Sequence, residues 1–228
     1  ARGAEVTDGA FGENLVVSGY DFTKFPIGTR FTCKDVVLEL TQIGKECHHG
    51  CEIFQKMGEC IMPTNGVFAK VLHGGKISVG DEFHVQYRAA VITLSDTASK
   101  GEREDASGAA VEEIVGKEGY EVVFKKIIPD DGDTLTALLC ELSDEDKADL
   151  ILTTGGTGFS KRDNTPEATM RAVERETPGI SEAMRYYSLQ ITPRAMLSRG
   201  VSGIRKEALI VNLPGSPKAV RECLEYAI

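Results

Sequence analysis

Hydrophobic and polar positions follow different patterns in the first and second parts of the chain. Up to about Gln86, short alternating runs are separated by glycine and proline, and the clearest lie at 35–43, 66–72 and 80–87. Alternation with a period of two is typical of half-buried strands, and several short strands spaced in this way indicate an all-β barrel or sandwich. We therefore predict an all-β barrel or sandwich for residues 1–87.

The second part alternates buried strands with amphipathic helices. Apolar runs predict strands at 89–95, 120–128, 149–154 and 208–213. Helical periodicity and helix-start signals predict helices at 107–119, 133–145, 165–176 and from Pro217 onward. Strands that alternate with helices form crossover units, which build a mainly parallel sheet with helices on both faces. We therefore predict a three-layer α/β domain over residues 88–228.

The two predicted domains meet near residue 88 with almost no linker, and the chain contains no internal repeat. The first residue is not Met, and the last lies in a helix-like pattern that has no cap. We therefore expect both ends to be cut from a longer parent. On this expectation the start of the β domain and the end of the α/β domain are missing.

Composition narrows the classes of partner. The formal net charge is −9, which argues against nonspecific binding to nucleic acid or to an anionic membrane, because both need a broad basic field. No apolar run approaches the roughly 20 residues that cross a bilayer, and no signal peptide is seen, so we expect a cytoplasmic protein. Its six cysteines are read as thiols rather than as a disulfide framework.

The unusual polar residues of the second part follow its strands. Four such segments lie at 95–96, 129–131, 155–158 and 214–218. Because ligands of open α/β sheets bind beyond the carboxyl ends of the strands, these four loops are expected to converge on one rim and form a site.

The segment DLILTTGGTGFSKRDNTPEATM, residues 149–170, is the most informative of these loops. Its glycines allow the backbone to approach a ligand closely, and successive free N–H groups form a nest for an anion. Gly-Gly also ends strands for simple turn reasons, so the motif alone leaves both readings open. The chain contains neither GxxxxGK[ST] nor GxGxxG, which argues against standard NTPase or dehydrogenase chemistry.

Charged residues of both signs lie on these loops. The acidic ones are Asp96, Asp130, Asp131 and Asp163, and the basic ones are Lys161, Arg162, Lys218 and Arg221. A loop aspartate is usually a cap or turn residue, but several beside a phosphate nest indicate Mg²⁺, which proteins hold with one or two carboxylates plus substrate phosphates. The cations are either attractors of a polyanion or solvated surface charges.

With these loops in view, residues 89–228 resemble the molybdopterin adenylyltransferase family. The resemblance rests on TLSD (93–96), IIPDD (127–131), TTGGTGFSKRDNTPEAT (153–169), PGISEAMR (178–185) and LSRGVSGIRKEALIVNLPGSPKAV (197–220). It implies a three-layer α/β fold, often trimeric. It also implies transfer of AMP from Mg-ATP to the terminal phosphate of molybdopterin, release of pyrophosphate, and delivery of the product to a partner that inserts molybdate.

The resemblance also assigns roles to residues. The acidic pair that the family uses in catalysis and in Mg²⁺ binding falls on Asp130 and Asp163. Contacts to molybdopterin and ATP fall on Ser95, Asp96, Thr154, Gly155, Gly156, Thr157, Gly158, Pro214, Gly215, Ser216 and Lys218. The alternative function is a non-catalytic carrier or scaffold that binds molybdopterin. The presence of both aspartates favours the enzyme, because a pure binding protein needs no paired metal site.

Residues 1–87 resemble a MOSC domain, the all-β barrel related to part of the molybdenum-cofactor sulfurases. The resemblance rests on DGAFGENL (8–15), PIGTRF (26–31), VVLELTQIGKEC (36–47) and NGVFAKVLHGGKISVGDEF (65–83). It makes Cys47 the candidate sulfur site, although Gly-Lys-Glu-Cys stands where the family has Arg-x-Pro-Cys.

Two alternatives remain open for the β domain. One is a metal site formed by Cys47, His48, His49, Cys51 and Cys60, although the spacing is loose beside the usual zinc patterns. The other is a domain that handles molybdate or sulfur, with the α/β domain serving mainly as an oligomerising scaffold.

Overall fold

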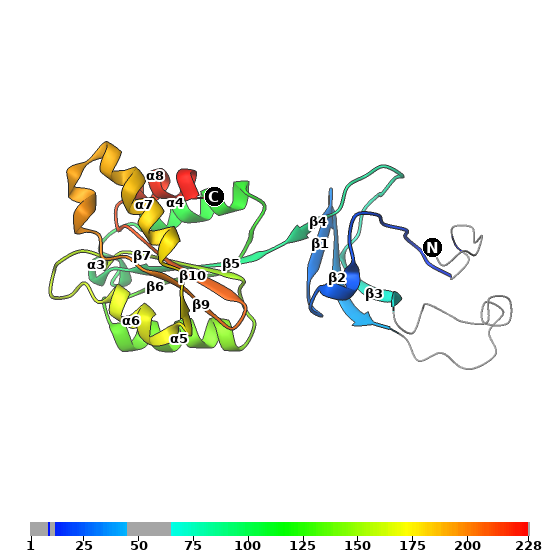
Figure 1. The fold of residues 1–228 in the computed structure, drawn as a ribbon, viewed down its shortest axis with the longest axis horizontal. Coiled ribbons are helices and arrows are strands. Elements are labelled where there is room, and N and C mark those ends of the chain that lie inside the picture. Colours follow the sequence, from blue (N-terminus) through cyan, green and yellow to red (C-terminus); the bar gives the residue numbers. More distant parts are fainter. Residues whose placement is uncertain (1–8, 10–11, 45–64, 228) are drawn as a thin grey trace. The chain divides into compact units, whose positions relative to one another are not determined.

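The computed structural model describes residue 9, residues 12–44 and residues 65–227 (Figure 1). Contacts between Cα atoms divide the chain into two compact units, Ala1–Gln86 and Tyr87–Ile228. The two units are described separately. No helix in the described part of the chain is both long and apolar enough to cross a bilayer.

The first unit is an antiparallel sheet of four strands in the order β3-β2-β1-β4. The strands are β1 (Arg30–Cys33), β2 (Val36–Ile43), β3 (Val67–His73) and β4 (His84–Gln86). The predicted all-β class is therefore confirmed. Within the described residues the sheet is open, with β3 and β4 at its edges, so the closure expected of a barrel is not seen there.

Aromatic side chains cover one part of this sheet. Tyr20, Phe22 and Phe25 surround Phe31 of β1, with ring centroids 5.1–5.8 Å from the Phe31 ring. Phe22 belongs to a short 3-10 helix, η1 (Phe22–Lys24), whose first turn is capped by the carboxylate of Asp21. Tilted and edge-on contacts of this kind stabilise a small core beyond the area that they bury.

The second unit contains a six-stranded sheet in the order β6-β5-β7-β10-β9-β8. Its strands are β5 (Arg88–Leu94), β6 (Glu121–Ile128), β7 (Leu150–Thr154), β8 (Arg175–Glu176), β9 (Ser202–Arg205) and β10 (Ala208–Leu213). The first four in spatial order are parallel to one another, and β9 runs antiparallel to both of its neighbours, β10 and β8. The predicted mainly parallel sheet is confirmed.

Helices cover both faces of this sheet, which gives three layers (Figure 1). They are α3 (Asp96–Ser99), α4 (Ala106–Lys117), α5 (Gly132–Asp144), α6 (Thr165–Ala172), α7 (Pro178–Ile191), the 3-10 helix η2 (Pro193–Leu197) and α8 (Pro217–Ala227). Helices α4, α7 and α8 lie on one face, and α5 and α6 lie on the other.

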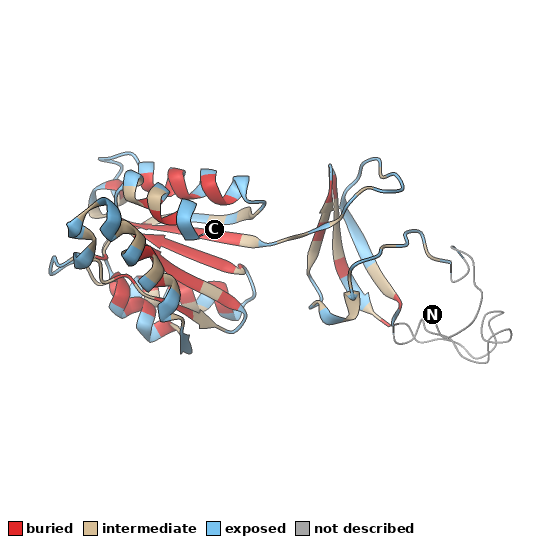
Figure 2. Cartoon of the chain, turned by 45° about the horizontal axis from the view of Figure 1, so that its top comes forward, coloured by how far each residue is buried: buried red, intermediate tan, exposed pale blue. Residues whose placement is uncertain are grey.

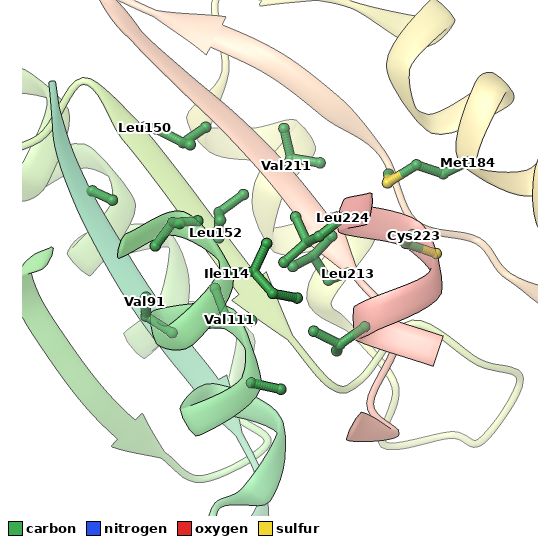
Figure 3. Close-up of a cluster of buried hydrophobic side chains, with 14 residues drawn as sticks. Val91, Val111, Ile114, Leu150, Leu152, Met184, Val211, Leu213, Cys223 and Leu224 are labelled. Atoms are coloured by element: carbon green, nitrogen blue, oxygen red, sulfur yellow. The ribbon is translucent and has the colours of Figure 1, made fainter. Parts of the chain in front are cut away.

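Strands β5, β7 and β10 are buried on both faces, as Figure 2 shows for the red strands between the two helix layers. Consecutive side chains of a strand enter different clusters. Val91 packs with α4 and α8, in the cluster drawn in Figure 3, whereas Ile92 packs with α5. A strand that is apolar on both faces is a continuous hydrophobic run, which is why 89–95 lacks polar alternation.

One predicted helix is too long. The expected helix at 165–176 ends at Ala172, and the next residue, Val173, is extended with φ −72° and ψ 147°. The backbone N–H of Glu174 then donates to the carbonyl of Ile204 at 2.9 Å, which begins the pairing of β8 with β9. Tertiary pairing overrides local helix propensity here, because the backbone groups after Ala172 find partners in a neighbouring strand.

We expect the attachment of α8 to α4 to depend on pH. Glu113 of α4 accepts hydrogen bonds from Arg221 of α8 at 2.7 Å and from Lys117 at 2.8 Å. Arg221, and then Lys117, hold the pKa of the Glu113 carboxyl at about 2. A depressed pKa stabilises the fold above the ordinary value of 4.5, and this contribution disappears as pH falls toward about 2.

Thermal unfolding of the wild type and of Glu113→Gln checks this expectation. The difference in Tm should be largest above pH ~5 and should shrink steadily below pH ~4. In an Arg221→Gln background the same Glu113 change should have a smaller effect. A Tm difference that does not vary with pH would show that the ion pair contributes nothing measurable.

Candidate active site

The loops that follow β5, β6, β7 and β10 are tied together at one edge of the sheet. Thr154 Oγ1 donates to the carbonyl of Pro214 at 2.7 Å, and Ser95 N–H donates to the carbonyl of Ile128 at 3.0 Å. At the start of α4, Ser107 Oγ donates to the carbonyl of Gly215 at 2.8 Å. The structure therefore brings all four predicted loops to one rim.

Gly155 lets the glycine loop, residues 154–158, cross the end of the neighbouring strand. Its φ is +98°, and a Cβ at this position would lie 2.3 Å from the carbonyl oxygen of Leu94. Both the backbone conformation and the available space therefore require glycine.

Gly156 lies over the start of α6. The hydroxyl of Thr165 donates to the carbonyl of Gly155 at 2.9 Å, and the N–H of Thr165 donates to the carbonyl of Gly156 at 3.2 Å. A Cβ on Gly156 would lie 2.3 Å from that hydroxyl and 3.6 Å from Oδ1 of Asp130. The absence of a side chain thus leaves the Asp130 carboxylate facing the loop backbone.

Asp96 and Asp130 form a reciprocal pair. The N–H of Asp96 donates to Oδ2 of Asp130, and the N–H of Asp130 donates to Oδ1 of Asp96, both at 3.2 Å. Burial raises the pKa of Asp130, and the charges of Asp96 and Asp163 raise it further, against the lowering effects of the Asp96 N–H and of Arg162. Two half-buried carboxylates held this close favour a cation between or beside them.

Asp163 organises the turn that leads into α6. Its carboxylate accepts from the N–H of Ser160 at 2.9 Å, and its own N–H donates to the carbonyl of Ser160 at 3.0 Å. A Cβ on Gly158 would lie 2.8 Å from Oδ2 of Asp163, which places this carboxylate against the last glycine of the loop. Asp130 and Asp163 therefore border the same glycine loop from different elements.

Arg199 is a site residue that the sequence reasoning did not identify. Its Nε donates to the carbonyl of Gly158 at 2.7 Å, and its other nitrogens contact the carbonyl of Asp163 and the carboxylate of Glu167. Its backbone N–H also donates to the carbonyl of Thr157 at 2.9 Å. One arginine from the segment before β9 thus holds both ends of the loop between β7 and α6. Periodicity carries no signal for such a contact.

Several predicted residues also cap helices. Ser95 Oγ accepts from the N–H of Ala98 at the start of α3, and Ser216 Oγ accepts from the N–H of Ala219 at the start of α8, both at 3.2 Å. Asp131 accepts from the N–H of Thr134 at 3.0 Å as the N-cap of α5. The Asp131 side chain therefore acts as a helix cap in this structure, which is a usual role for a loop aspartate.

The four cations on these loops do not behave alike. Arg162 pairs with Asp96 at 2.6 Å, so it lies over the acidic pair. Lys218 pairs with Glu222 one turn along α8 at 3.7 Å, and Arg221 is bound to Glu113 of α4. Lys161 lines an open hollow of about 540 Å³ beside the glycine loop, together with Phe159, Ser160, Asp163, Asn164, Glu167 and Arg199.

A more enclosed cavity of about 210 Å³ lies between α7, η2, the end of β10 and α8. Met184, Ser198, Pro214 and Cys223 are among its lining residues. Arg185 also lines it and donates to the carbonyl of Gly200 at 2.6 Å. Because Pro214 belongs to the loop that is bonded to Thr154, this cavity adjoins the glycine loop.

The donor set suits a cation held largely by its substrate. In the part of the chain that the structure describes, no group of three or more His, Cys, Asp or Glu side chains is placed to ligate one ion. The rim offers the carboxylates of Asp96 and Asp130, each of which accepts from the other residue's backbone N–H, with Asp163 nearby. This fits Mg²⁺, which proteins commonly hold with one or two carboxylates plus phosphate oxygens.

The candidate sulfur site, Cys47, lies outside the described residues, as do His48, His49, Cys51 and Cys60. Three described cysteines, Cys33, Cys140 and Cys223, are free thiols.

Residues 90–228 match the protein family described as "Probable molybdopterin binding domain". Because this match covers more than half of the chain, the chain belongs to that family. Residues 1–84 match the MOSC domain. These two matches confirm the family resemblances that the sequence motifs indicate for residues 89–228 and for residues 1–87.

Named relatives agree with the family. A molybdopterin adenylyltransferase from Helicobacter pylori (strain ATCC 700392 / 26695) is 45% identical over 137 residues, 59% of this chain and 78% of that protein. The structure of the molybdopterin biosynthesis enzyme MoaB from Thermus thermophilus has 45% identity and a TM-score of 0.58, covering 61% of this chain and 88% of that one. The tungsten cofactor synthesizing protein MoaB from Pyrococcus furiosus has 36% identity and a TM-score of 0.56, covering 61% and 89%.

Proposed function

We propose that this protein is a molybdopterin adenylyltransferase, which transfers AMP from Mg-ATP to the terminal phosphate of molybdopterin. The observation that carries the proposal is the placement of the Asp130 carboxylate beside Gly156, in a loop where three glycines leave the backbone accessible. The names of relatives 45% identical to this chain support the same activity. The enzyme is a nucleotidyltransferase of molybdenum cofactor biosynthesis.

The chemistry explains why such a site is needed. An oxygen of the molybdopterin phosphate attacks the α-phosphorus of ATP, the bond between the α- and β-phosphates breaks, and pyrophosphate leaves. Nucleophile and electrophile are both anionic, so rate enhancement has to come from positioning and charge neutralisation. A bound Mg²⁺ supplies charge neutralisation at the phosphates.

We assign the following roles to this chain's own residues. Asp130 and Asp163 hold or orient the cation, and Asp96 both fixes Asp130 and presents its own carboxylate to the same cation. The N–H groups of the glycine loop hold phosphate oxygens as an anion nest. Ser95, Pro214, Gly215, Ser216 and Lys218 complete the contacts to the two substrates around the rim.

We place the pterin ring system in the cavity between α7 and α8. The cavity has about 210 Å³ of space and is walled partly by apolar side chains such as Met184. A ring bound there directs its phosphate toward the glycine loop, because Pro214 connects the two sites through its bond to Thr154.

The alternative is a carrier or scaffold that binds molybdopterin without adenylylating it. The reciprocal pair of Asp96 and Asp130 argues for the enzyme, since a neutral pair would serve an anion-binding carrier better. Two half-buried carboxylates repel a phosphate unless a cation stands between them.

Further proposals concern assembly and the first unit. We propose that the protein forms a homotrimer and passes its product to a partner enzyme that inserts molybdate. We also propose that it acts in the cytoplasm, where ATP is available. We also propose that the first unit is a closed MOSC barrel that handles sulfur or metal through Cys47. The MOSC match to residues 1–84 supports this proposal.

Pyrophosphate release tests the function. Purified full-length protein with Mg-ATP should release pyrophosphate only when molybdopterin is added, and adenylyl-molybdopterin should form in equal amount. If molybdopterin binds and no pyrophosphate is released, the protein is a carrier instead.

Residues 87–228 alone should fold cooperatively and give the same product, because all four loops belong to this unit. A soluble fragment that binds no ATP would contradict the assignment of the whole site to this unit.

A further inference from the structure

Arg162 lies across the acidic pair from a different loop. Its Nη2 is 2.6 Å from Oδ2 of Asp96, at the start of α3, whereas Arg162 itself belongs to the turn before α6. Its backbone N–H donates to Ser160 Oγ at 3.3 Å, within the turn that Asp163 organises. The ion pair therefore connects two sides of the rim.

This ion pair is poorly suited to be a purely structural contact. The Arg162 side chain is 63% exposed and that of Asp96 is 36% exposed, so water screens their attraction. Exposed pairs of this kind contribute little to stability. Among the residues that the structure describes, Asp96 is the only carboxylate that pairs with the Arg162 guanidinium, which leaves most of its donors for another anion.

The chemistry at the rim identifies that anion. A guanidinium binds a phosphate through two parallel hydrogen bonds, and a phosphate carries more negative charge than a carboxylate. A divalent cation arriving at Asp96 and Asp130 competes with Arg162 for the same carboxylate oxygen. Cation binding therefore releases the guanidinium at the place where the phosphates of the nucleotide must lie.

We propose that Arg162 is a positioning residue for the nucleotide, held on Asp96 until a divalent cation displaces it onto the phosphate chain. This inference rests on the proposed adenylylation. It makes one residue oppose cation binding while it assists nucleotide binding. A residue with a merely structural role would change both affinities in the same direction or neither.

Arg162→Gln separates these effects. Without nucleotide, the variant should bind Mn²⁺ about threefold more tightly than the wild type, because a competing exposed ion pair is lost. With saturating Mg²⁺, it should bind ATP at least about tenfold more weakly, because a charge-assisted contact is lost. Arg162→Lys should retain part of the ATP affinity, since lysine keeps the charge but not the paired hydrogen bonds. Isothermal calorimetry measures each affinity.

Lys117→Gln is the matched control. Lys117 also pairs with a single carboxylate, Glu113, at 2.8 Å, and its loss changes the net charge by the same amount at the far end of α4. Both affinities of this variant should stay within about twofold of the wild type. Thermal melts of both variants verify that each is folded.

Each outcome bears on the proposal. Opposite changes in cation and ATP affinity for Arg162→Gln, absent from Lys117→Gln, establish it. An unchanged ATP affinity, or two affinities that fall together, overturns it. If the opposite changes occur while the wild type forms no adenylyl-molybdopterin, the proposed function fails and the role of Arg162 in nucleotide binding stands.

Discussion

Replacing Asp130 by Asn is expected to slow single-turnover adenylylation by about 10²–10³, the usual cost of losing one charge-stabilising group at an active site. Asn keeps the shape and retains an oxygen that can accept from the Asp96 N–H, so the loop should stay in place. It removes the negative charge that faces Gly156. Molybdopterin affinity should therefore largely survive while cation binding weakens. Asp163→Asn should behave in the same way.

Asp131→Asn is the matched control for this prediction. It makes the same chemical change at the adjacent residue, but Asp131 caps α5 through the N–H of Thr134, and Asn caps helices equally well. Its turnover should stay near that of the wild type. Near-wild-type turnover in both Asp130→Asn and Asp163→Asn would show that these carboxylates are ordinary loop residues.

Gly155→Ala should lower the free energy of unfolding by at least about 2 kcal/mol, because a left-handed conformation is strained for alanine and a backbone clash adds to that strain. The clash is with the carbonyl oxygen of Leu94, which would lie 2.3 Å from the new Cβ. Leu94 is the last residue of β5, which is paired on both sides, with β6 and with β7, so it has little freedom to move. Denaturant unfolding measures the loss of unfolding free energy, and the affinity for ATP should fall as well.

Gly179→Ala provides the comparison. Gly179 lies in the first turn of α7, and a Cβ added there meets no atom within 4 Å. Alanine is favoured over glycine in helices by up to about 1 kcal/mol, so this variant should be as stable as the wild type or more so. If Gly155→Ala proved no less stable than Gly179→Ala, the close crossing of the glycine loop over β5 would not exist in solution.

Much of the α/β unit could be predicted because its local and global signals agree. Strands β5, β7 and β10 are largely apolar runs, and their burial on both faces explains that pattern. Ser216 and Pro217 mark the start of α8, and the Ser216 hydroxyl does cap it. Strand ends followed by glycine and aspartate were enough to anticipate the rim.

Elements without a clean period were harder. Strand β9 contains Gly203, and β8 has only two residues, so neither carries a hydrophobic alternation. The pairing of β8 with β9 also shortened the predicted helix at 165–176. In the first unit, the edges of the sheet depend on hydrogen bonds between distant segments, which a local pattern does not encode.

The sequence alone determined the class of each unit, the order of the four parallel strands and of α4, α5, α6 and α8 along the chain, and the residue types at the rim, because periodicity and turn chemistry are local properties. Only the tertiary structure decided which of the four loop aspartates bond to one another and which one caps a helix. It also decided that Arg199 holds the loop before α6 and that Arg162 rests on Asp96. These contacts join residues far apart in the sequence, so their geometry depends on how the strands and helices pack rather than on any local spacing.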